Sequence, residues 1–244
     1  MTERETPRRR GSYGIDAPYG PAFIALVAAL ELALAISFGN VRNLLAGLFT
    51  LAILGLYLHG TLRGKFVVWA ELLETLNLRG DERILDMGCG RGAVLLMAAQ
   101  HLITGRAVGV DLWRSADQSG NSTEATQRNA VAEGVADRVE LHTGDMLALP
   151  FDENSFDVVV SSLAIHNIGG RAGREKAIDE AARMLRSGGR LMIADVRATG
   201  QYQARLAKIG MSDVARLGLG WRFWWSGPWA VTGIVTATKP ERRI

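Results

Sequence analysis

The stretch ILDMGCGRGAVL, residues 84–95, constrains the fold more than any other part of this chain. An apolar run ends in Asp86, glycines follow at alternate positions, and an apolar pattern then resumes. This order predicts a buried strand, a tight turn and a helix, with a ligand at the end of the strand. Its spacing, G-x-G-x-G, differs from the G-x-G-x-x-G of dinucleotide sites, where a helix N-terminus faces a pyrophosphate. A nicotinamide-dependent oxidoreductase, which would share the fold, is therefore disfavoured.

Apolar strand-like runs alternate with helical patterns from residue 66 onward. Continuous apolar strands separated by helices predict an α/β fold, with a mostly parallel sheet covered on both faces. The last two runs, residues 219–226 and 229–240, predict an antiparallel hairpin joined around Gly227–Pro228. The expected strands before it are residues 83–88, 106–111, 139–144, 156–164 and 189–196, and the expected helices are residues 66–76, 92–102, 123–133 and 173–185.

Two strongly apolar runs, residues 21–38 and 44–58, precede this region. Both are apolar on every side and each is close to the roughly 20 residues that span a bilayer, so they predict a helical hairpin that anchors the chain in a membrane. The alternative is a pair of buried helices packed on the domain or across a dimer, which Glu31 and the short runs favour. The expected organisation is a polar segment (1–20), the hydrophobic hairpin (21–60) and one domain (61–244).

The basic residues around the hairpin are distributed unequally. Arg8, Arg9 and Arg10 precede it and Arg63 and Lys65 follow it, whereas the intervening turn holds Arg42. The positive-inside rule then places both ends of the hairpin, and the domain after it, on the cytoplasmic side.

Composition excludes other classes of function. The net charge is +3 and the arginines are otherwise scattered, so no basic stripe for nucleic acid is expected. The single cysteine, Cys89, cannot form an internal disulfide, which fits a reducing compartment. It lacks a partner constellation for nucleophilic catalysis, and no cluster of His, Cys and Asp has metal-ligand spacing, so no metal site is expected.

A carboxylate at Asp86 would suit a cationic ligand such as S-adenosylmethionine (SAM), which carries a sulfonium and an ammonium but no phosphate. The segment DMGCGRG resembles motif I of class I SAM-dependent methyltransferases, E/D-x-G-x-G-x-G. Four later segments resemble those of the same family in the same order, and the resemblance covers residues 66–238. They are VGVDLW, GDMLALPF, FDVVVSSLAIHNI and LRSGGRLMIAD. The resemblance implies a Rossmann-like methyltransferase sheet and SAM as the cofactor.

The resemblance also implies roles for individual residues. Asp111 would hold the ribose hydroxyls, Asp145 would accept from the adenine amino group, and Met146 would pack on the adenine ring. Asp111 and Asp145 are alternatively caps of local structure, and Trp113 either stacks beside adenine or packs on the next helix. The expected cofactor-binding set is Asp86, Gly88, Cys89, Gly90, Gly92, Asp111, Leu112, Trp113, Asp145, Met146 and Ser161.

His166 follows the fourth expected strand, where members of the family bring the acceptor to the methyl group. SAM is already activated, so positioning and desolvation supply most of the catalysis. A base is needed when the acceptor has a proton to lose, and histidine suits that role near neutral pH. His166 is therefore either a catalytic base or a residue that only shapes the pocket.

Two aromatic segments leave alternatives open. In SYGIDAPYG, residues 12–20, the side chains of Tyr13, Asp16 and Tyr19 belong either to a lid over the pocket, with substrate contacts, or to a linker at the membrane surface. In WRFWW, residues 221–225, and Trp229, the rings belong either to the core of the terminal hairpin or to a membrane interface.

The sequence thus predicts a membrane-anchored SAM-dependent methyltransferase that faces the cytoplasm and acts on a small, lipophilic molecule. The preference for a lipophilic acceptor rests on location, because an enzyme fixed at a bilayer meets the molecules that partition into it. A non-catalytic SAM-binding or membrane scaffold protein is the alternative.

Overall fold

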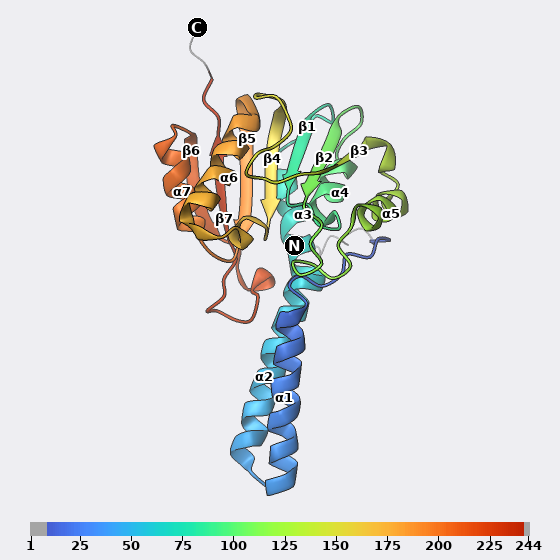
Figure 1. The fold of residues 1–244 in the computed structure, drawn as a ribbon, viewed down its shortest axis with the longest axis vertical. Coiled ribbons are helices and arrows are strands. Elements are labelled where there is room, and N and C mark those ends of the chain that lie inside the picture. Colours follow the sequence, from blue (N-terminus) through green and yellow to red (C-terminus); the bar gives the residue numbers. More distant parts are fainter. Residues whose placement is uncertain (1–8, 242–244) are drawn as a thin grey trace, which may run out of the picture.

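The structure, a computed structural model, describes residues 9–241, and within them seven strands form one sheet in the order β3-β2-β1-β4-β5-β7-β6 (Figure 1). All neighbouring strands are parallel except β7, which runs antiparallel to both β5 and β6. This arrangement confirms the predicted Rossmann-like α/β fold with an antiparallel C-terminal hairpin. The strands are β1 (Arg83–Met87), β2 (Arg106–Asp111), β3 (Val139–Thr143), β4 (Phe156–Ser162), β5 (Leu185–Asp195), β6 (Ser212–Gly218) and β7 (Gly233–Thr238).

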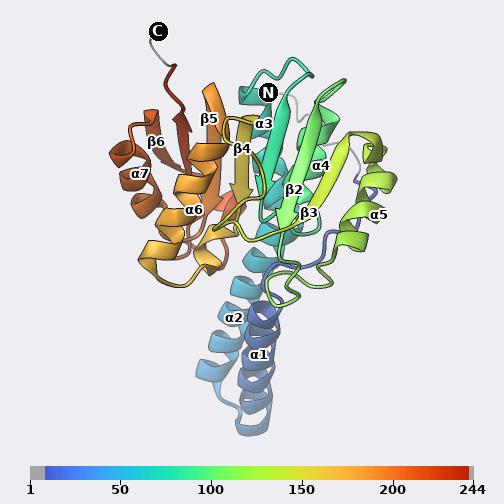
Figure 2. The same cartoon turned by 45° about the horizontal axis from the view of Figure 1, so that its top comes forward.

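Helices cover both faces of the sheet, as the continuous apolar strands require. One buried cluster joins the sheet to α3 (Lys65–Thr75), α4 (Ala93–Gln100) and α5 (Thr123–Glu133). The other cluster joins the opposite face to α6 (Gly170–Met184) and α7 (Thr199–Lys208), and Figure 2 shows these two helices together on their side of the sheet. Short 3-10 helices lie at η2 (Ala136–Arg138), η3 (Ile165–Asn167) and η4 (Trp221–Phe223).

The helices α1 (Tyr19–Phe38) and α2 (Val41–His59), the N-terminal helix pair, project from the sheet at one end (Figures 1 and 2). Gly39 closes α1 in the left-handed conformation, and the Asn40 side chain caps α2 by accepting from the Arg42 backbone N–H. Glu31, the acid within the first apolar run, accepts a hydrogen bond of 2.7 Å from the Thr50 hydroxyl of the partner helix. The pair stands away from the domain, so the alternative of two helices packed on the domain is wrong, whereas packing across a dimer stays an untested alternative.

The second helix of the pair continues into the domain. A single turn of π-helix, η1 (Gly60–Gly64), joins α2 to α3. The boundary expected at residues 60–61 falls inside this continuous run of helix. Of the arginines expected before the pair, Arg8 lies outside the described residues, whereas Arg9 and Arg10 are exposed.

The first strand of the C-terminal hairpin differs from the prediction. Residues 219–226 were expected to form it, but the strand is β6, which ends at Gly218. Gly220 has a φ of 75° and begins η4, so the chain leaves the extended conformation before the aromatic residues. Residues 219–232 instead form a long connection, which we call the aromatic loop, closed by a short bridge between Trp224 and Val231.

Candidate active site

A cavity of about 330 Å³ opens at the carboxyl ends of the parallel strands, where ligands bind in open α/β sheets. The arrowheads of these strands point toward the N-terminal helix pair in Figure 1, so the cavity lies at the end of the sheet from which the pair projects. Eight of the residues expected to bind cofactor line it, together with the catalytic candidate His166 and the lid candidate Asp16. The eight are Asp86, Gly88, Cys89, Gly90, Asp111, Leu112, Asp145 and Met146.

In the glycine loop after β1, neighbouring side chains approach the backbone too closely to leave room for a Cβ. Gly88 has a φ of 75°, and a Cβ on it would lie 2.3 Å from the Ala164 Cβ. Gly90 has a φ of 51°, and a Cβ there would lie 2.4 Å from the Gln118 Oε1. Both positions therefore require glycine, and the resulting bare backbone leaves room for a ligand.

Asp111, at the end of β2, fixes the same loop. One carboxylate oxygen accepts from the Gly90 N–H at 2.8 Å, and the other accepts from the Trp113 N–H at 2.6 Å and from the Asn121 amide at 3.2 Å. An ionised carboxylate offers about four acceptor sites, so Asp111 retains capacity for a ligand hydroxyl.

Asp86 is the most perturbed acid in the cavity wall. It is 1% exposed, and its Oδ1 has no hydrogen-bond partner among the described residues. Burial raises the pKa of Asp86 from 3.8 to about 8. A buried, unpartnered carboxylate oxygen facing a cavity fits a cationic ligand, which would satisfy it and favour its charged form.

Three residues expected to bind cofactor lie outside the cavity wall as the structure describes it. Gly92 begins α4 with a φ of 84° and serves close packing, because a Cβ there would meet Leu96 and Thr126 at 3.0 Å. Trp113 donates from its indole N–H to the Thr143 hydroxyl and packs against the core. Ser161 donates to the Met87 carbonyl within the sheet, and its neighbour Ser162 faces the cavity instead, because successive strand residues point to opposite faces.

Asp145 makes the contact of the cap alternative and has a position that leaves the adenine alternative a prediction. It lines the cavity, and its Oδ1 also accepts from the Leu147 backbone N–H at 2.9 Å, as a turn cap does. Met146 lies beside it in the cavity wall, with its Cε 3.1 Å from where a Cβ on Gly88 would be.

His166 is held by an acid that the sequence analysis did not single out. Asp195, at the end of β5, is 1% exposed and lies 2.5 Å from the His166 Nδ1. Its other oxygen accepts from the His166 backbone N–H at 3.0 Å and from the Tyr202 hydroxyl at 3.0 Å. Burial and the neighbouring Asp195 raise the pKa of Tyr202, which keeps that hydroxyl a donor. With Nδ1 bound to a carboxylate, Nε2 is the nitrogen left to exchange a proton.

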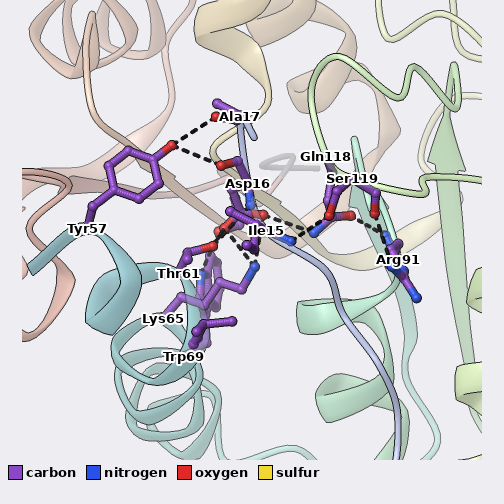
Figure 3. Close-up of polar contacts among 12 residues, drawn as sticks. Ile15, Asp16, Ala17, Tyr57, Thr61, Lys65, Trp69, Arg91, Gln118 and Ser119 are labelled. Atoms are coloured by element: carbon purple, nitrogen blue, oxygen red, sulfur yellow. Dashed lines mark hydrogen bonds and ion pairs between the residues drawn. The ribbon is translucent and has the colours of Figure 1, made fainter. Parts of the chain in front are cut away.

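The N-terminal segment closes one side of the cavity through a buried network (Figure 3). Asp16 is 8% exposed and pairs with Lys65 of α3 at 2.7 Å. It also accepts from the Thr61 hydroxyl at 2.7 Å and from the Gln118 amide at 2.9 Å. Gln118 in turn accepts from the Arg91 backbone N–H of the glycine loop at 2.7 Å. Asp16 thereby links the helix pair, the loop after β2 and the glycine loop.

The two tyrosines of this segment lie elsewhere. Tyr13 packs edge-on against Phe66, with ring centroids 5.1 Å apart, and donates to Glu133 at 2.9 Å. Tyr19 begins α1 and is 75% exposed. Of the three lid candidates, therefore, Asp16 alone reaches the cavity in the described structure.

Cys89 is a wall residue and not a nucleophile. It is 6% exposed, and burial raises the pKa of its thiol further above the ordinary value, which suppresses the reactive thiolate. In the described part of the chain, His, Cys, Asp and Glu side chains form no group of three that could hold a metal ion.

Residues 85–193 match the family model described as a methyltransferase domain. The ubiquinone/menaquinone biosynthesis C-methyltransferase of Roseobacter denitrificans is 33% identical over 129 residues, which are 52% of this chain and 48% of that protein. The 27-O-demethylrifamycin SV methyltransferase of Amycolatopsis mediterranei is 34% identical over 128 residues, or 51% of this chain and 42% of that protein. The chain spans about half the length of the curated relatives it matches.

Solved structures show the same fold. Geranyl diphosphate C-methyltransferase from Streptomyces coelicolor, in complex with Mg²⁺, geranyl-S-thiolodiphosphate and S-adenosyl-L-homocysteine, aligns with a TM-score of 0.56 at 17% identity, covering 70% of this chain and 74% of that one. A second structure of geranyl diphosphate methyltransferase, in complex with SAM, also has a TM-score of 0.56 at 17% identity and covers 70% of this chain and 84% of that one.

Proposed function

We propose that this chain is a SAM-dependent methyltransferase that transfers a methyl group to a small, lipophilic acceptor at the cytoplasmic face of a membrane. Two observations support this proposal: residues 85–193 match the methyltransferase domain model, and the sheet has the Rossmann-like order. The observation that carries the proposal is the cavity in which Asp86, buried and unpartnered at Oδ1, faces the bare glycine loop beside Asp111.

The cavity residues fit the cofactor. Asp111 would hold the ribose hydroxyls, Asp145 and Met146 the adenine, and Asp86 with the glycine loop the cationic methionine end. When bound, SAM supplies an activated methyl group on a sulfonium. The chain itself contributes a site that excludes water and fixes the direction of approach, which is where the rate of an in-line displacement is gained.

His166 and Asp195 supply the base. Asp195 holds the Nδ1 side of the ring and leaves Nε2 to accept a proton from the acceptor. Because a base has a use only where a proton is lost, this geometry favours an acceptor with a hydroxyl or an acidic C–H. The relatives named above include both C- and O-methyltransferases. Asp195 is a positioning residue, since it acts through His166.

Asp16 is proposed as the closing residue of the cofactor site, in place of a mobile lid. Its ion pair with Lys65 and its bond to Gln118 hold the N-terminal segment against the glycine loop. Asp16→Ala should therefore weaken SAM binding, whereas Tyr19→Ala, an exposed change at the start of α1, should leave it unchanged.

Membrane attachment is supported by the N-terminal helix pair. Among the described residues, α1 and the helix that starts at Val41 are long and apolar enough to cross a bilayer, with mean hydropathies of 2.2 and 1.7. Large apolar side chains on both are exposed, as lipid-facing residues would be. Arg9, Arg10 and Arg63 lie exposed at the base of the pair and Arg42 at its far end, which favours a cytoplasmic domain. Lys65, counted with them from the sequence, is buried against Asp16 and adds nothing to this surface charge.

The test is methyl incorporation from radiolabelled SAM into a bacterial lipid extract by the full chain in phospholipid vesicles, followed by mass spectrometry of the labelled product. Label in an extractable lipophilic product is expected, with at least a hundredfold lower rate for His166→Ala and unchanged SAM affinity. Asp195→Asn should lower the rate and shift its pH profile. SAM binding by calorimetry without any labelled product would indicate a non-catalytic SAM-binding protein. Binding of NAD in place of SAM would overturn the cofactor assignment.

A further inference from the structure

The aromatic loop, residues 219–232, lies along α2 and not over the sheet. Trp221 stacks on His59 with ring centroids 5.5 Å apart, and Trp225 meets Tyr57 edge-on at 5.0 Å. Trp229 reaches Phe49 at 6.3 Å. Phe49 precedes His59 by ten residues, so these contacts follow α2 for about 15 Å away from the domain.

Two glycines of η1 allow the backbone of this loop to approach the helix closely. A Cβ on Gly60 would lie 2.6 Å from the Trp224 carbonyl oxygen, and a Cβ on Gly64 would overlap the Arg222 carbonyl oxygen at 1.6 Å. Two side-chain contacts hold the loop further: Arg222 forms a bidentate pair with Glu71 of α3, and Thr232 donates to the Phe223 carbonyl at 2.6 Å. The loop is therefore held in place against η1 and α3, and its tryptophans lie along α2.

The outer face of the loop is apolar and continuous with the helix pair. Trp229 is 63% exposed, and Phe49, which it touches, is 58% exposed. Because the two rings are in contact, the medium that surrounds Phe49 also surrounds Trp229. Trp221 lies closer to the domain, beside His59 at the end of α2. This level would correspond to the boundary between headgroups and hydrocarbon, where tryptophan is favoured.

We propose that the aromatic loop is a second membrane-inserted element, which enters the bilayer beside α2 with Trp229 among the lipid chains and Trp221 near the headgroups. This inference rests on the membrane attachment proposed above and adds a surface to it. The occupant of the surface is the phospholipid bilayer itself.

The inner end of the same loop reaches the candidate active site. Trp225 lines the cavity and lies 6.4 Å from the His166 ring, while its other contact is Tyr57 of α2. An acceptor dissolved in the bilayer thus meets one aromatic surface that begins at Trp229 in the lipid and ends beside His166. Through Trp225, the loop contributes to the wall of the site on the side of the helix pair.

Spin labels on single cysteines test the depth of the loop. Trp229→Cys and Pro228→Cys place labels on the exposed tip of the loop, Ile36→Cys places one on α1, and Ile103→Cys places one on an exposed isoleucine of the sheet domain. The native Cys89 is buried and, with its raised pKa, should not react. The full-length protein is reconstituted in vesicles of phosphatidylcholine and phosphatidylglycerol, and the collision rates of each label with oxygen and with a water-soluble nickel chelate are measured.

The labels at 229 and 228 should resemble the label at 36, with at least a threefold higher ratio of oxygen to nickel collisions than the label at 103. SAM binding by each labelled protein shows that it is folded. If the label at 36 lies in lipid while those at 229 and 228 resemble 103, the loop is outside the bilayer and this inference is overturned. A label at 36 that resembles 103 would instead overturn the membrane attachment on which it rests.

Discussion

The sheet domain and the N-terminal helix pair are both rich in leucine and isoleucine, yet these side chains have opposite surroundings. Ile84 and Leu96 of the sheet domain are fully buried, whereas Ile36 and Leu30 of the helix pair are 86% and 59% exposed. Soluble monomers rarely expose contiguous apolar surfaces of this kind. The comparison teaches that one chain combines a region with a buried apolar core and a region with an exposed apolar surface. Asp16 and Lys65 lie where the two regions meet.

The largest effect on the free energy of unfolding is expected at the Asp16–Lys65 ion pair, where the two regions meet. Lys65→Met leaves the Asp16 carboxylate buried without its cation, so the free energy of unfolding should fall by about 3–5 kcal/mol. Thermal and denaturant unfolding of the detergent-solubilised protein would measure it. The double variant Asp16→Asn/Lys65→Met removes both charges and should recover most of the loss. A single variant as stable as the double one would mean that the two regions are not held together by this pair.

A matched pair of leucines compares the regions directly. Leu96→Ala, in the core, should lower the free energy of unfolding by about 2–5 kcal/mol through the cavity it leaves. Leu30→Ala, in the helix pair, should change it by less than about 0.5 kcal/mol in detergent, because its side chain has few protein neighbours to lose. Equal losses in the two variants, measured by the same unfolding assay, would contradict this difference between a buried and an exposed apolar region.

SAM affinity should depend on pH through Asp86, a residue of the sheet domain, and not through the helix pair. Burial raises the pKa of Asp86 to about 8, so in the ligand-free protein this carboxyl is protonated at neutral pH. A bound cation favours the ionised form, lowers that pKa and releases the proton. SAM affinity should therefore rise with pH, by up to about tenfold per unit, and level off above pH 8.

Calorimetry in buffers of different ionisation enthalpy would count the released proton. The control is Asp86→Asn, in which this contribution is absent while the titration of SAM itself remains. The same profile is expected in detergent and in vesicles. A profile identical in the wild type and in Asp86→Asn would remove Asp86 from the cationic end of the site.

The smallest effect is expected at the outer contact between the aromatic loop and α3. The Arg222–Glu71 pair is 39% and 56% exposed, so Arg222→Ala should cost less than about 1 kcal/mol of unfolding free energy. The close backbone contact at Gly60 and Gly64 also holds the loop, and this substitution does not change it. A loss comparable to that of Lys65→Met would show that the loop, and not the buried pair, fixes the helix base.

Local patterns predicted the sheet domain well because its strands are short apolar runs that end in an acid or a turn. The same pattern also contained Asp195. RILD, VGVD and MIAD each end in an aspartate at the same edge of a parallel sheet, and only the first two were treated as functional. The matched relatives and the shared fold support the predicted methyltransferase class and SAM as its cofactor, while the individual site residues remain predictions.

Contacts between distant segments could not be predicted in this way. Asp16 and Lys65 are 49 residues apart and belong to no shared motif, so their pairing appears only when the chain is folded. The position of the aromatic loop depends in the same manner on Gly60 and Gly64, which belong to no motif that the sequence analysis singled out. The sequence analysis named Ser161, whereas Ser162 lines the cavity, because strand phase cannot be fixed to one residue when both faces of a strand are buried.

The unbroken passage from α2 through η1 into α3 has a mechanical consequence. A domain on a flexible tether samples many heights above its anchor, but here the stand-off is set by helical rise, about 1.5 Å per residue. In a membrane, the methyl donor would then lie at a constant height above the bilayer. The protein would select acceptors by the distance of their reactive group from the bilayer surface. A reactive group carried too deep, or held too far out by its own headgroup, would miss the donor even where its chemistry is right.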